Sequence, residues 1–408
     1  MTHQQRKSAR RHDIDWLRVI FVCGLIMIHV AAIFDPYPIT AVKGRKSFPL
    51  VLFATFLHEW RLAILFIVSG AGSYFALGFL SGREFIWMRI KRIVIPLIMG
   101  TFLIVPIHLY YWQFQGTQGY DKTYIHFYAT IMWRFFVNGS FGTARETLHW
   151  AHLWFLAYLF IASLIALPLF LYLRHGKGQH LIPRLAGLIE KPWAIFLFSL
   201  PIVLVEVSLR AASTSGRAII IGDWSTFTVS LVLFIYGFLI VSNDKFRRAI
   251  EAHKRSALLA GIVTSLIYLV ITFALRNFPS GYNLKFLLFM ALRGFSVWCW
   301  CVAILGFASK HLNFNHKLLP YLNEAVYPVY IVHLPLATIV AYYVVRWPIP
   351  PLVQFAIIVI LTLVAAVLVF ELIRRTKITR FLFGLKVNKP KQAQMATETA
   401  VTPADPPA

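Results

Sequence analysis

The chain has 408 residues, of which 59% are hydrophobic and 16% are aromatic, and its formal net charge at pH 7 is +24. A soluble protein of this length would expose too much apolar surface, so the composition excludes a soluble fold and indicates an all-α polytopic membrane protein. In a soluble chain the positive charge would suggest nucleic acid as a partner. Cytoplasmic loops of membrane proteins collect Lys and Arg, so we expect a lipid bilayer and no nucleic acid.

About ten transmembrane helices are predicted, because ten apolar runs are long enough to cross a bilayer. They cover residues 16–34, 61–80, 93–112, 150–173, 192–209, 224–241, 256–275, 286–308, 325–345 and 351–373. The second run can begin earlier, since residues 48–60 are also apolar. No small-residue cleavage site follows the basic N-terminal segment, so the first run is expected to remain as a helix.

The distribution of positive residues predicts the orientation of these spans. With the N-terminus inside, the inner segments hold 26 Lys and Arg residues and the outer loops hold 11, which places both termini in the cytoplasm. The longest outer connection, residues 113–149, is aromatic and predicts a helix on the outer surface. Residues 1–386 are expected to form one integral membrane domain, and the polar, Pro- and Ala-rich residues 387–408 a disordered cytoplasmic tail.

The first span carries two polar residues, Arg18 and His29, in the stretch DIDWLRVIFVCGLIMIHV. Their spacing in an α-helix leaves them about 20° from a common face and about 16 Å apart along the axis. Ionisable groups inside a bilayer cost about 2.5–3.5 kcal/mol each on insertion scales, which makes them candidates for function. The alternatives are snorkelling to the cytoplasmic surface for Arg18 and a hydrogen-bonded structural role for His29.

The second span carries a polar group in the stretch FLHEWRLAILFIVSG, where His58, Glu59 and Arg61 are expected at its outer end. The alternative is a solvated helix start in which these side chains form ion pairs with one another. The third span is entered through REFIWMRIKRIVIP, where Arg89 and Arg92 are neighbours on one helical face. Paired guanidinium groups suit a phosphate or pyrophosphate, whereas the alternative is contact with anionic lipid.

Later spans add two histidines and a glutamate. His152, in HWAHLWFLAYL, is expected at the outer end of the fourth span, close to His149. In NEAVYPVYIVHLPL, Glu324 is expected at the inner end of the ninth span and His333 near its middle. Because a histidine in the middle of a membrane is costly, function is favoured over packing for His333.

Familiar soluble-enzyme motifs are absent: the chain has no GxSxG elbow, Walker loop, HExxH or HxxxxD box. The three cysteines, Cys23, Cys299 and Cys301, fall in apolar runs where they act as small hydrophobic residues. We therefore expect no metal site and no bound cofactor, and any chemistry must come from the dispersed polar residues.

Five sequence elements, in order, resemble the acyltransferase 3 family of integral membrane acyltransferases. Arg18 with His29 is similar to the family's pattern of an arginine, ten residues and a histidine, and RLAILFIVSG is similar to its second-helix signature. Arg89-Ile-Lys-Arg92 with Pro96, HLWFLAYL and VYIVHLP resemble its RxxR, HLWFL and YxxHxP segments. The likeness covers residues 13–385.

The resemblance implies an enzyme that moves an acyl group from cytoplasmic acyl-CoA, as a co-substrate, to a hydroxyl of a carbohydrate acceptor outside the membrane. It implies that Arg89 and Arg92 bind the donor's phosphates, that Arg18 contacts the donor or its carbonyl, and that His29 is a general base or an acyl-accepting nucleophile. The other candidates are expected to bind substrate: Arg61, His58, Glu59, His152, His333 and Glu324.

The C-terminal end, with Glu371 and TRFLFGLKV, is similar to the branch of the family associated with succinylation of periplasmic glucans. Glu324 and Pro328 suit other members, so the acceptor stays open, and the acyl group is either succinyl or acetyl. The branch implies a multi-pass protein of the cell inner membrane.

Two alternatives from other classes remain at this point. Ten spans with buried Arg, His and Glu residues also suit a transporter of an organic anion or a glycan intermediate, although no internal repeat supports it. A flippase or structural partner in glycan assembly is the other, and it predicts that His29 can be replaced without loss of function.

Overall fold

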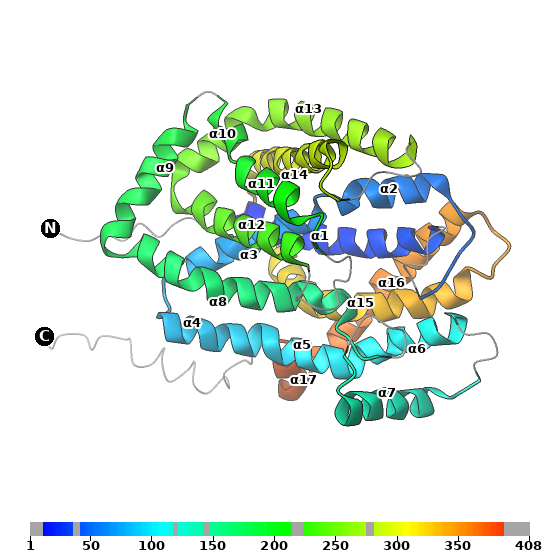
Figure 1. Cartoon of the computed structure of the whole chain (residues 1–408). Coiled ribbons are helices and arrows are strands. Elements are labelled where there is room, and N and C mark those ends of the chain that lie inside the picture. Colours follow the sequence, from blue (N-terminus) through cyan, green and yellow to red (C-terminus); the bar gives the residue numbers. More distant parts are fainter. Residues whose placement is uncertain are drawn as a thin grey trace, which may run out of the picture.

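The structure is a computed structural model of the chain. It describes residues 11–35, 41–116, 121–141, 147–191, 193–213, 223–274 and 281–386. In these ranges the regular structure is helical, apart from one isolated bridge between Phe141 and Leu148, which confirms the all-α prediction (Figure 1). The predicted tail, residues 387–408, lies outside the described residues.

The helices follow one another along the chain with short 3-10 and π segments between them, which are labelled η. Their bounds are α1 His12–Ala31, η1 Ala32–Phe34, α2 Phe48–His58, α3 Arg61–Ala76, α4 Gly82–Arg89, η2 Ile90–Val94, α5 Ile95–Met99, η3 Gly100–Ile104, α6 Val105–Gly116, α7 Tyr124–Asn138, η4 Ala151–Leu153, α8 Trp154–Arg174, η5 Gly176–His180, α9 Leu181–Ile189, α10 Ala194–Leu197, α11 Leu200–Leu209, α12 Trp224–Ser242, α13 Asp244–Ala274, α14 Leu284–His311, α15 Leu319–Val344, α16 Pro351–Ile373 and α17 Lys377–Leu382.

Nine helical segments within the described ranges are long and apolar enough to cross a membrane, and each overlaps one of the predicted spans. The chain is therefore a polytopic membrane protein. Helix α1 lies near the middle of the bundle, between the α13–α14 pair on one edge and the α4–α6 helix on the other (Figure 1). It contacts α2, α3, α14, α15 and α16, so most of the segment with Arg18 and His29 packs against other spans.

The predicted span at 192–209 is shorter and broken. It consists of α10 and α11, and residues 194–209 rise only about 24 Å in helical form, against a hydrocarbon core of about 30 Å. Pro201 stands in the first turn of α11, where its missing N–H costs no helical hydrogen bond. The segment still runs along α12, because Glu190 before it pairs with Lys245 just after α12, and Arg210 at its end pairs with Asp223 at the start of α12.

The polar residues of the second span lie deeper in it than the sequence predicts. It runs from Phe48 to Ala76, and Glu59 and Trp60 interrupt it between α2 and α3. Glu59 and Arg61 are buried near the middle of this 29-residue segment, not at an outer end. The apolar residues before His58 continue the span outward, which displaces the polar group toward the membrane interior.

The third span, Gly82–Phe114, widens twice from α-helix to π-helix. Pro96 has no N–H for the carbonyl of Arg92, four residues earlier, and Pro106 has none for Phe102, so both prolines release a helical carbonyl where the π segments lie. Such widenings occur frequently at functional sites. The first of them begins directly after Arg89.

Close helix packing supports the core beside this span. A Cβ atom added to Gly70 on α3 would lie 1.9 Å from the carbonyl oxygen of Phe234 on α12, and one added to Gly237 would lie 1.9 Å from that of Ile67. The two glycines therefore allow the backbones of α3 and α12 to touch, as small residues do between membrane helices.

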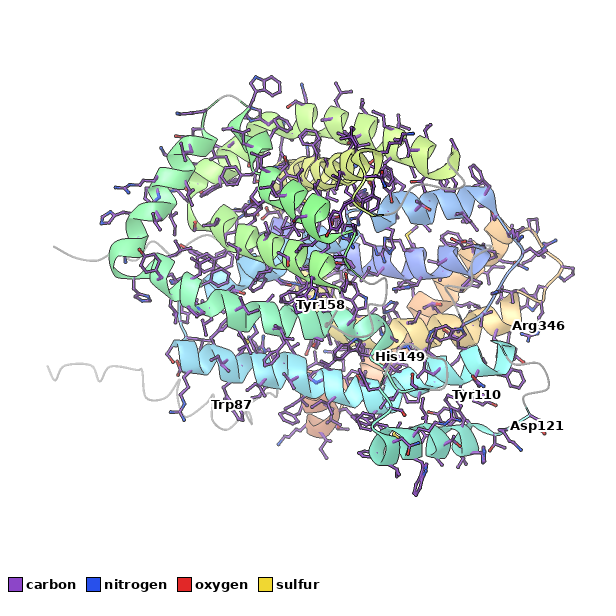
Figure 2. All side chains as sticks on the ribbon, viewed as in Figure 1. Trp87, Tyr110, Asp121, His149, Tyr158 and Arg346 are labelled. Carbon is purple, nitrogen blue, oxygen red and sulfur yellow. The ribbon has the colours of Figure 1, made fainter. Side chains whose placement is uncertain are left out.

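The predicted surface helix in the outer connection is α7, which lies beside α6 at the edge of the bundle (Figure 1). Thr123 caps its N-terminus, and Gly139, at a φ of 61°, ends it in the left-handed region. Ile125, Trp133 and Phe136 are exposed, which suits contact with lipid headgroups. In Figure 2, Tyr110 and Arg346 lie at this end of the bundle and Trp87 at the opposite end.

The positive-inside topology predicts the result of cysteine labelling. Single cysteines near Arg83, Lys177 and Lys386 are expected to be shielded from an impermeant thiol reagent added to intact cells, and cysteines near Lys43 and Gly139 to react. The three native cysteines are first replaced by alanine, because Cys23 is exposed on the bundle. Reaction of the Lys386 label in intact cells would overturn the topology.

A buried ion network joins α11 to α14. Arg293 and Arg210 each place a guanidinium nitrogen 2.6 Å from the Glu206 carboxylate, whose side chain is 3% exposed. Removing one partner of a buried pair costs about 3–5 kcal/mol, so Glu206→Ala is expected to lower the melting temperature strongly. Glu190→Ala, which removes exposed pairs with Lys245 and Arg248, is the control and should cost less. An equal decrease in the melting temperature of the purified Glu206→Ala and Glu190→Ala proteins would contradict this prediction.

Candidate active site

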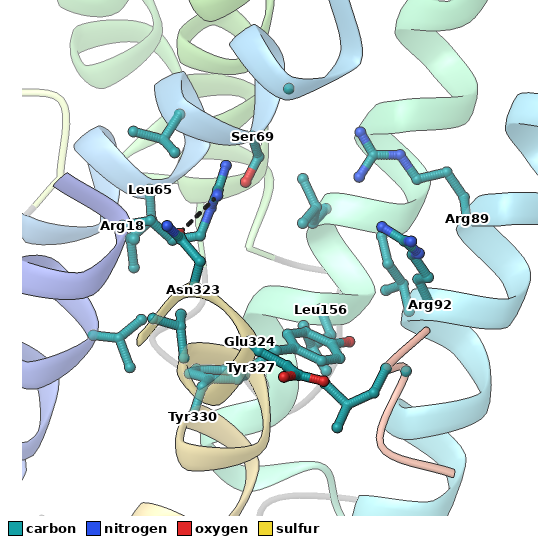
Figure 3. Close-up of a pocket in the computed structure, with 18 of the residues that line it drawn as sticks. Arg18, Leu65, Ser69, Arg89, Arg92, Leu156, Asn323, Glu324, Tyr327 and Tyr330 are labelled. Carbon is teal, nitrogen blue, oxygen red and sulfur yellow. Dashed lines mark hydrogen bonds between the residues drawn. The ribbon is translucent and has the colours of Figure 1, made fainter. Parts of the chain in front are cut away.

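A cavity of about 620 Å³ enters the bundle between α1, α3, the α4–η2 segment, α8, α15 and the residues after α17 (Figure 3). Its wall is apolar along α3 and α8 and positively charged toward one end. That end is predicted to be cytoplasmic, because the chain's positive inner segments lie there. The positive side chains that line the cavity are Arg18, Arg89, Arg92, Arg380 and Lys386.

Arg89 and Arg92 stand together on one wall of the cavity, as their spacing predicts (Figure 3). Helix α4 begins with a capping box formed by Ser81 and Glu84, which fixes the start of the segment that carries them. Arg89 Nη2 donates to Ser73 Oγ at 2.5 Å, and its buried Nε has no hydrogen-bond partner among the described residues. Arg92 is exposed at the cavity wall. Both guanidinium groups therefore offer donors to an anion in the cavity.

Arg18 and His29 face the same neighbouring helix, which confirms their predicted common face. Arg18 Nη1 donates to Asn323 Oδ1 on α15 at 3.4 Å and to Asp15 Oδ1 at 3.2 Å. The His29 ring lies 5.3 Å, between centroids, from the ring of His333, which is also on α15. Arg18 lines the cavity, so it does not merely snorkel to the surface.

Three histidines form a cluster beyond the apolar part of the cavity: His29, His152 and His333. The rings of His152 and His333 lie 5.0 Å apart, and His333 is fully buried. Tyr330 connects the cluster to the cavity, since it lines the cavity and its hydroxyl donates to the His152 carbonyl at 2.6 Å. Residues from three distant parts of the chain thus meet at one place.

Backbone carbonyls of α15 fix the tautomers of two histidines in this cluster, His152 and His333. Pro335 has no N–H, so the carbonyl of Ile331 receives no bond from within the helix, and His152 Nε2–H donates to it at 2.9 Å. His333 Nδ1–H likewise donates to the Tyr330 carbonyl at 2.6 Å. A carbonyl only accepts, so in the neutral rings the lone pairs lie on His152 Nδ1 and His333 Nε2. Both atoms are buried without a partner among the described residues.

The three polar residues predicted as a group in the second span, His58, Glu59 and Arg61, do not lie together in the structure. Arg61 is buried and lies close enough to His29 for the two side chains to interact electrostatically. Glu59 instead accepts a hydrogen bond from Ser265 on α13 at 3.0 Å and is not part of the cavity wall. His58 is half-buried at the end of α2 and is not part of the cavity wall either.

Glu324 lies in the cavity wall, where Arg380 Nη2 donates to its Oε1 at 2.7 Å. Arg380 was not among the predicted site residues, since nothing in its local sequence distinguishes it from other positive inner residues. His108 on α6 was also missed, although a histidine inside the apolar run LIVPIHLYYW carries the same signal as His333. Its Nδ1 lies 2.8 Å from Thr338 Oγ1 on α15.

No group of three or more His, Cys, Asp or Glu side chains within the described ranges is arranged to hold a metal ion. The arrangement instead offers a cationic chamber at one end of a membrane bundle and basic nitrogens in its interior. These features define a membrane protein with a positively charged cavity whose wall, at Tyr330, contacts buried histidines.

The family of the chain follows from comparison with known proteins. The family model Acyl_transf_3, described as an acyltransferase domain, matches residues 11–371, so the chain belongs to this family and is a membrane acyltransferase. This result favours the enzyme over the transporter and scaffold interpretations.

Among the curated relatives are proteins named glucans biosynthesis protein C from several Salmonella strains. The proteins of Salmonella schwarzengrund, Salmonella typhi and Salmonella typhimurium are each 23% identical to this chain over 393 residues, covering 93% of the chain and 96% of the relative. No solved structure matches the chain significantly.

Proposed function

We propose that the protein transfers a succinyl or acetyl group from cytoplasmic acyl-CoA to a hydroxyl of an extracytoplasmic glycan, across the inner membrane. The observation that carries the proposal is the cavity, which is lined by a cluster of arginines and by Tyr330, the residue that contacts the buried His152 and His333. The name of the relatives favours a glucan as the acceptor.

The cavity suits the donor in charge and in shape. Arg89 and Arg92 present planar guanidinium groups that can bind phosphate oxygens in bidentate fashion. The apolar wall along Leu65, Leu156 and Leu159 suits the uncharged arm that carries the thioester. In this arrangement the nucleotide end stays at the cytoplasmic mouth, and the thioester reaches the histidine cluster.

His29 acts as the general base in the proposed reaction. Its imidazole takes the proton from the acceptor hydroxyl, the oxygen attacks the thioester carbonyl, and the carbon–sulfur bond breaks. The sulfur of the leaving CoA takes up the proton, so the sum is an ester and CoA thiol with no net proton gained or lost. An imidazole suits this exchange, because its ring nitrogen can accept a proton and release it again.

The other polar residues have supporting roles. Arg18 lies about 16 Å from His29 along α1, so it binds the donor away from the reacting carbonyl. His152 and His333 are fixed in tautomer by α15 and present lone pairs next to His29, where they can accept hydrogen bonds from the acceptor's hydroxyl groups. Arg61 adds positive charge where the carbonyl oxygen becomes negative in the transition state.

Mass spectrometry of surface and periplasmic glycans tests this function. A deletion strain is expected to lack an acyl substituent that returns with the wild-type gene and does not return with the His29→Ala gene. Glycans with the same acylation in the wild-type and deletion strains would contradict the proposal.

A further inference from the structure

The C-terminal end of the described chain forms one wall of the cavity. We define the strap as residues 377–386, which comprise α17 and the turn that follows it. Helix α17 packs on α5. Gly384 has a φ of 68°, and a Cβ atom added to it would lie 2.9 Å from the Tyr327 ring and 3.0 Å from the Arg92 carbonyl oxygen. The strap is therefore held closely against the segment that carries Arg89 and Arg92.

Arg380 is, with Lys386, one of two positively charged strap residues that line the cavity. Its Nε and Nη2 donate to the carbonyl of Lys386 at 2.9 and 2.6 Å, and Nη2 also donates to Glu324 at 2.7 Å. Its side chain is 11% exposed, against 30% for Glu324. The guanidinium is thus oriented by the strap's own backbone, and its acidic partner is the more accessible of the two.

The charges around the cavity do not balance. Four arginines and one lysine line it, and Glu324 is the single carboxylate among its lining residues. The formal excess among these lining residues is four positive charges, and Asp15, which pairs with Arg18 from outside the lining, reduces it to three. A phosphomonoester carries about 1.5–2 negative charges at pH 7, so a ligand with a phosphomonoester and a pyrophosphate carries enough negative charge to balance this excess.

We propose that Arg380 is a further donor-binding residue, and that Glu324 occupies it as a stand-in for a donor phosphate. The inference rests on the proposed use of acyl-CoA. It adds a second half to the phosphate site, built by the strap from Arg380 and Lys386 beside the segment that carries Arg89 and Arg92. When the donor binds, a phosphate takes the place of the Glu324 carboxylate on the Arg380 guanidinium.

Because Glu324 and the donor phosphate compete for Arg380, replacing Arg380 and replacing Glu324 should change donor affinity in opposite directions. Removing Arg380 removes a charged donor to the phosphate, which weakens binding. Removing the charge of Glu324 releases Arg380 from its competitor and also removes a negative charge from the cavity, which strengthens binding. A purely structural ion pair would behave differently, because breaking it from either side would loosen the strap and weaken binding.

The test measures binding of CoA and of 3′-dephospho-CoA to the purified full-length protein in nanodiscs by calorimetry. Arg380→Ala is expected to weaken CoA binding by about tenfold to hundredfold, as for the loss of a charge-assisted hydrogen bond. Glu324→Gln is expected to strengthen it severalfold. Arg374→Ala is the matched control, since Arg374 pairs with Glu371 outside the cavity lining and should leave binding unchanged.

The direction of the change in CoA affinity in Glu324→Gln distinguishes competition from a structural ion pair, even if Arg380→Ala disturbs the strap. Weaker CoA binding by Glu324→Gln, or wild-type binding by Arg380→Ala, would overturn the inference. If Arg89→Ala lost CoA binding and Arg380→Ala bound CoA like the wild type, the strap would not belong to the donor site. The proposed function would then still stand. Failure of the wild-type protein to bind CoA would instead remove the proposed donor.

Discussion

Replacing His29 with alanine is expected to reduce acyl transfer by about 10²–10⁴-fold, the range that a positioned general base contributes. Donor binding should survive, because the proposed phosphate site at Arg89 and Arg92 shares the cavity wall with Arg18, which lies about 16 Å from His29 along α1. Insertion and folding should also survive, since removal of a polar group from the membrane interior does not penalise insertion. The measurement is the rate of glycan acylation and the affinity for CoA, both with the purified variant.

A matched control separates this effect from a general effect of losing a histidine. His126 is exposed on the surface helix α7, outside the cluster, and His126→Ala should acylate at the wild-type rate. His29→Ala protein that still acylates glycan at nearly the wild-type rate would contradict the assigned base. Equal loss of CoA binding and of turnover would show instead that His29 supports the donor site as a whole.

Replacement of Arg89 or Arg92 is expected to have the opposite effect to His29→Ala: it should weaken acyl-CoA binding more than it lowers the rate of acyl transfer. Alanine at either position should weaken acyl-CoA binding by about tenfold to hundredfold, because each guanidinium offers charge-assisted hydrogen bonds to phosphate. Lysine should rescue poorly, since it keeps the charge and loses the bidentate geometry. The maximal rate at saturating donor should change less than the affinity.

The control for this pair is Arg83, which is exposed on the same helix and does not line the cavity. Arg83→Ala should bind CoA as the wild type does, although it also removes a positive inner charge. If Arg89→Ala and Arg92→Ala matched Arg83→Ala in CoA affinity, the pair would serve topology and lipid contact alone.

The spans and the common face of α1 could be predicted from the sequence, because hydropathy and helical periodicity are local properties. Arg18 and His29 are 11 residues apart, and a regular helix alone brings both of them to α15. The same periodicity does not reveal where a helix is interrupted. Glu59 and Trp60 break the second span within an apolar run, so the expected outer position of Arg61 was wrong.

The composition of the site depended more on contacts between distant segments. Arg61 and Glu59 are two residues apart, yet one approaches His29 and the other bonds to Ser265 on α13. Residues two positions apart on a helix already face different sides, so which of the two approaches His29 depends on how α3 packs against α1. Arg380 lies in a short helix after the last span, and its place in the cavity follows from the path of the strap, which the local sequence does not specify.

The central claim is that one protein takes an acyl group from a donor on the cytoplasmic side and delivers it to a glycan on the other side. Proteoliposomes with a defined orientation test it most directly, with labelled acyl-CoA added on the side of Lys386 and the glucan confined to the opposite compartment. The account predicts labelled ester on the glucan, dependent on His29, while the donor's nucleotide stays where it was added. Label that reaches the glucan compartment only as intact acyl-CoA, or equal esterification by His29→Ala protein, would contradict it.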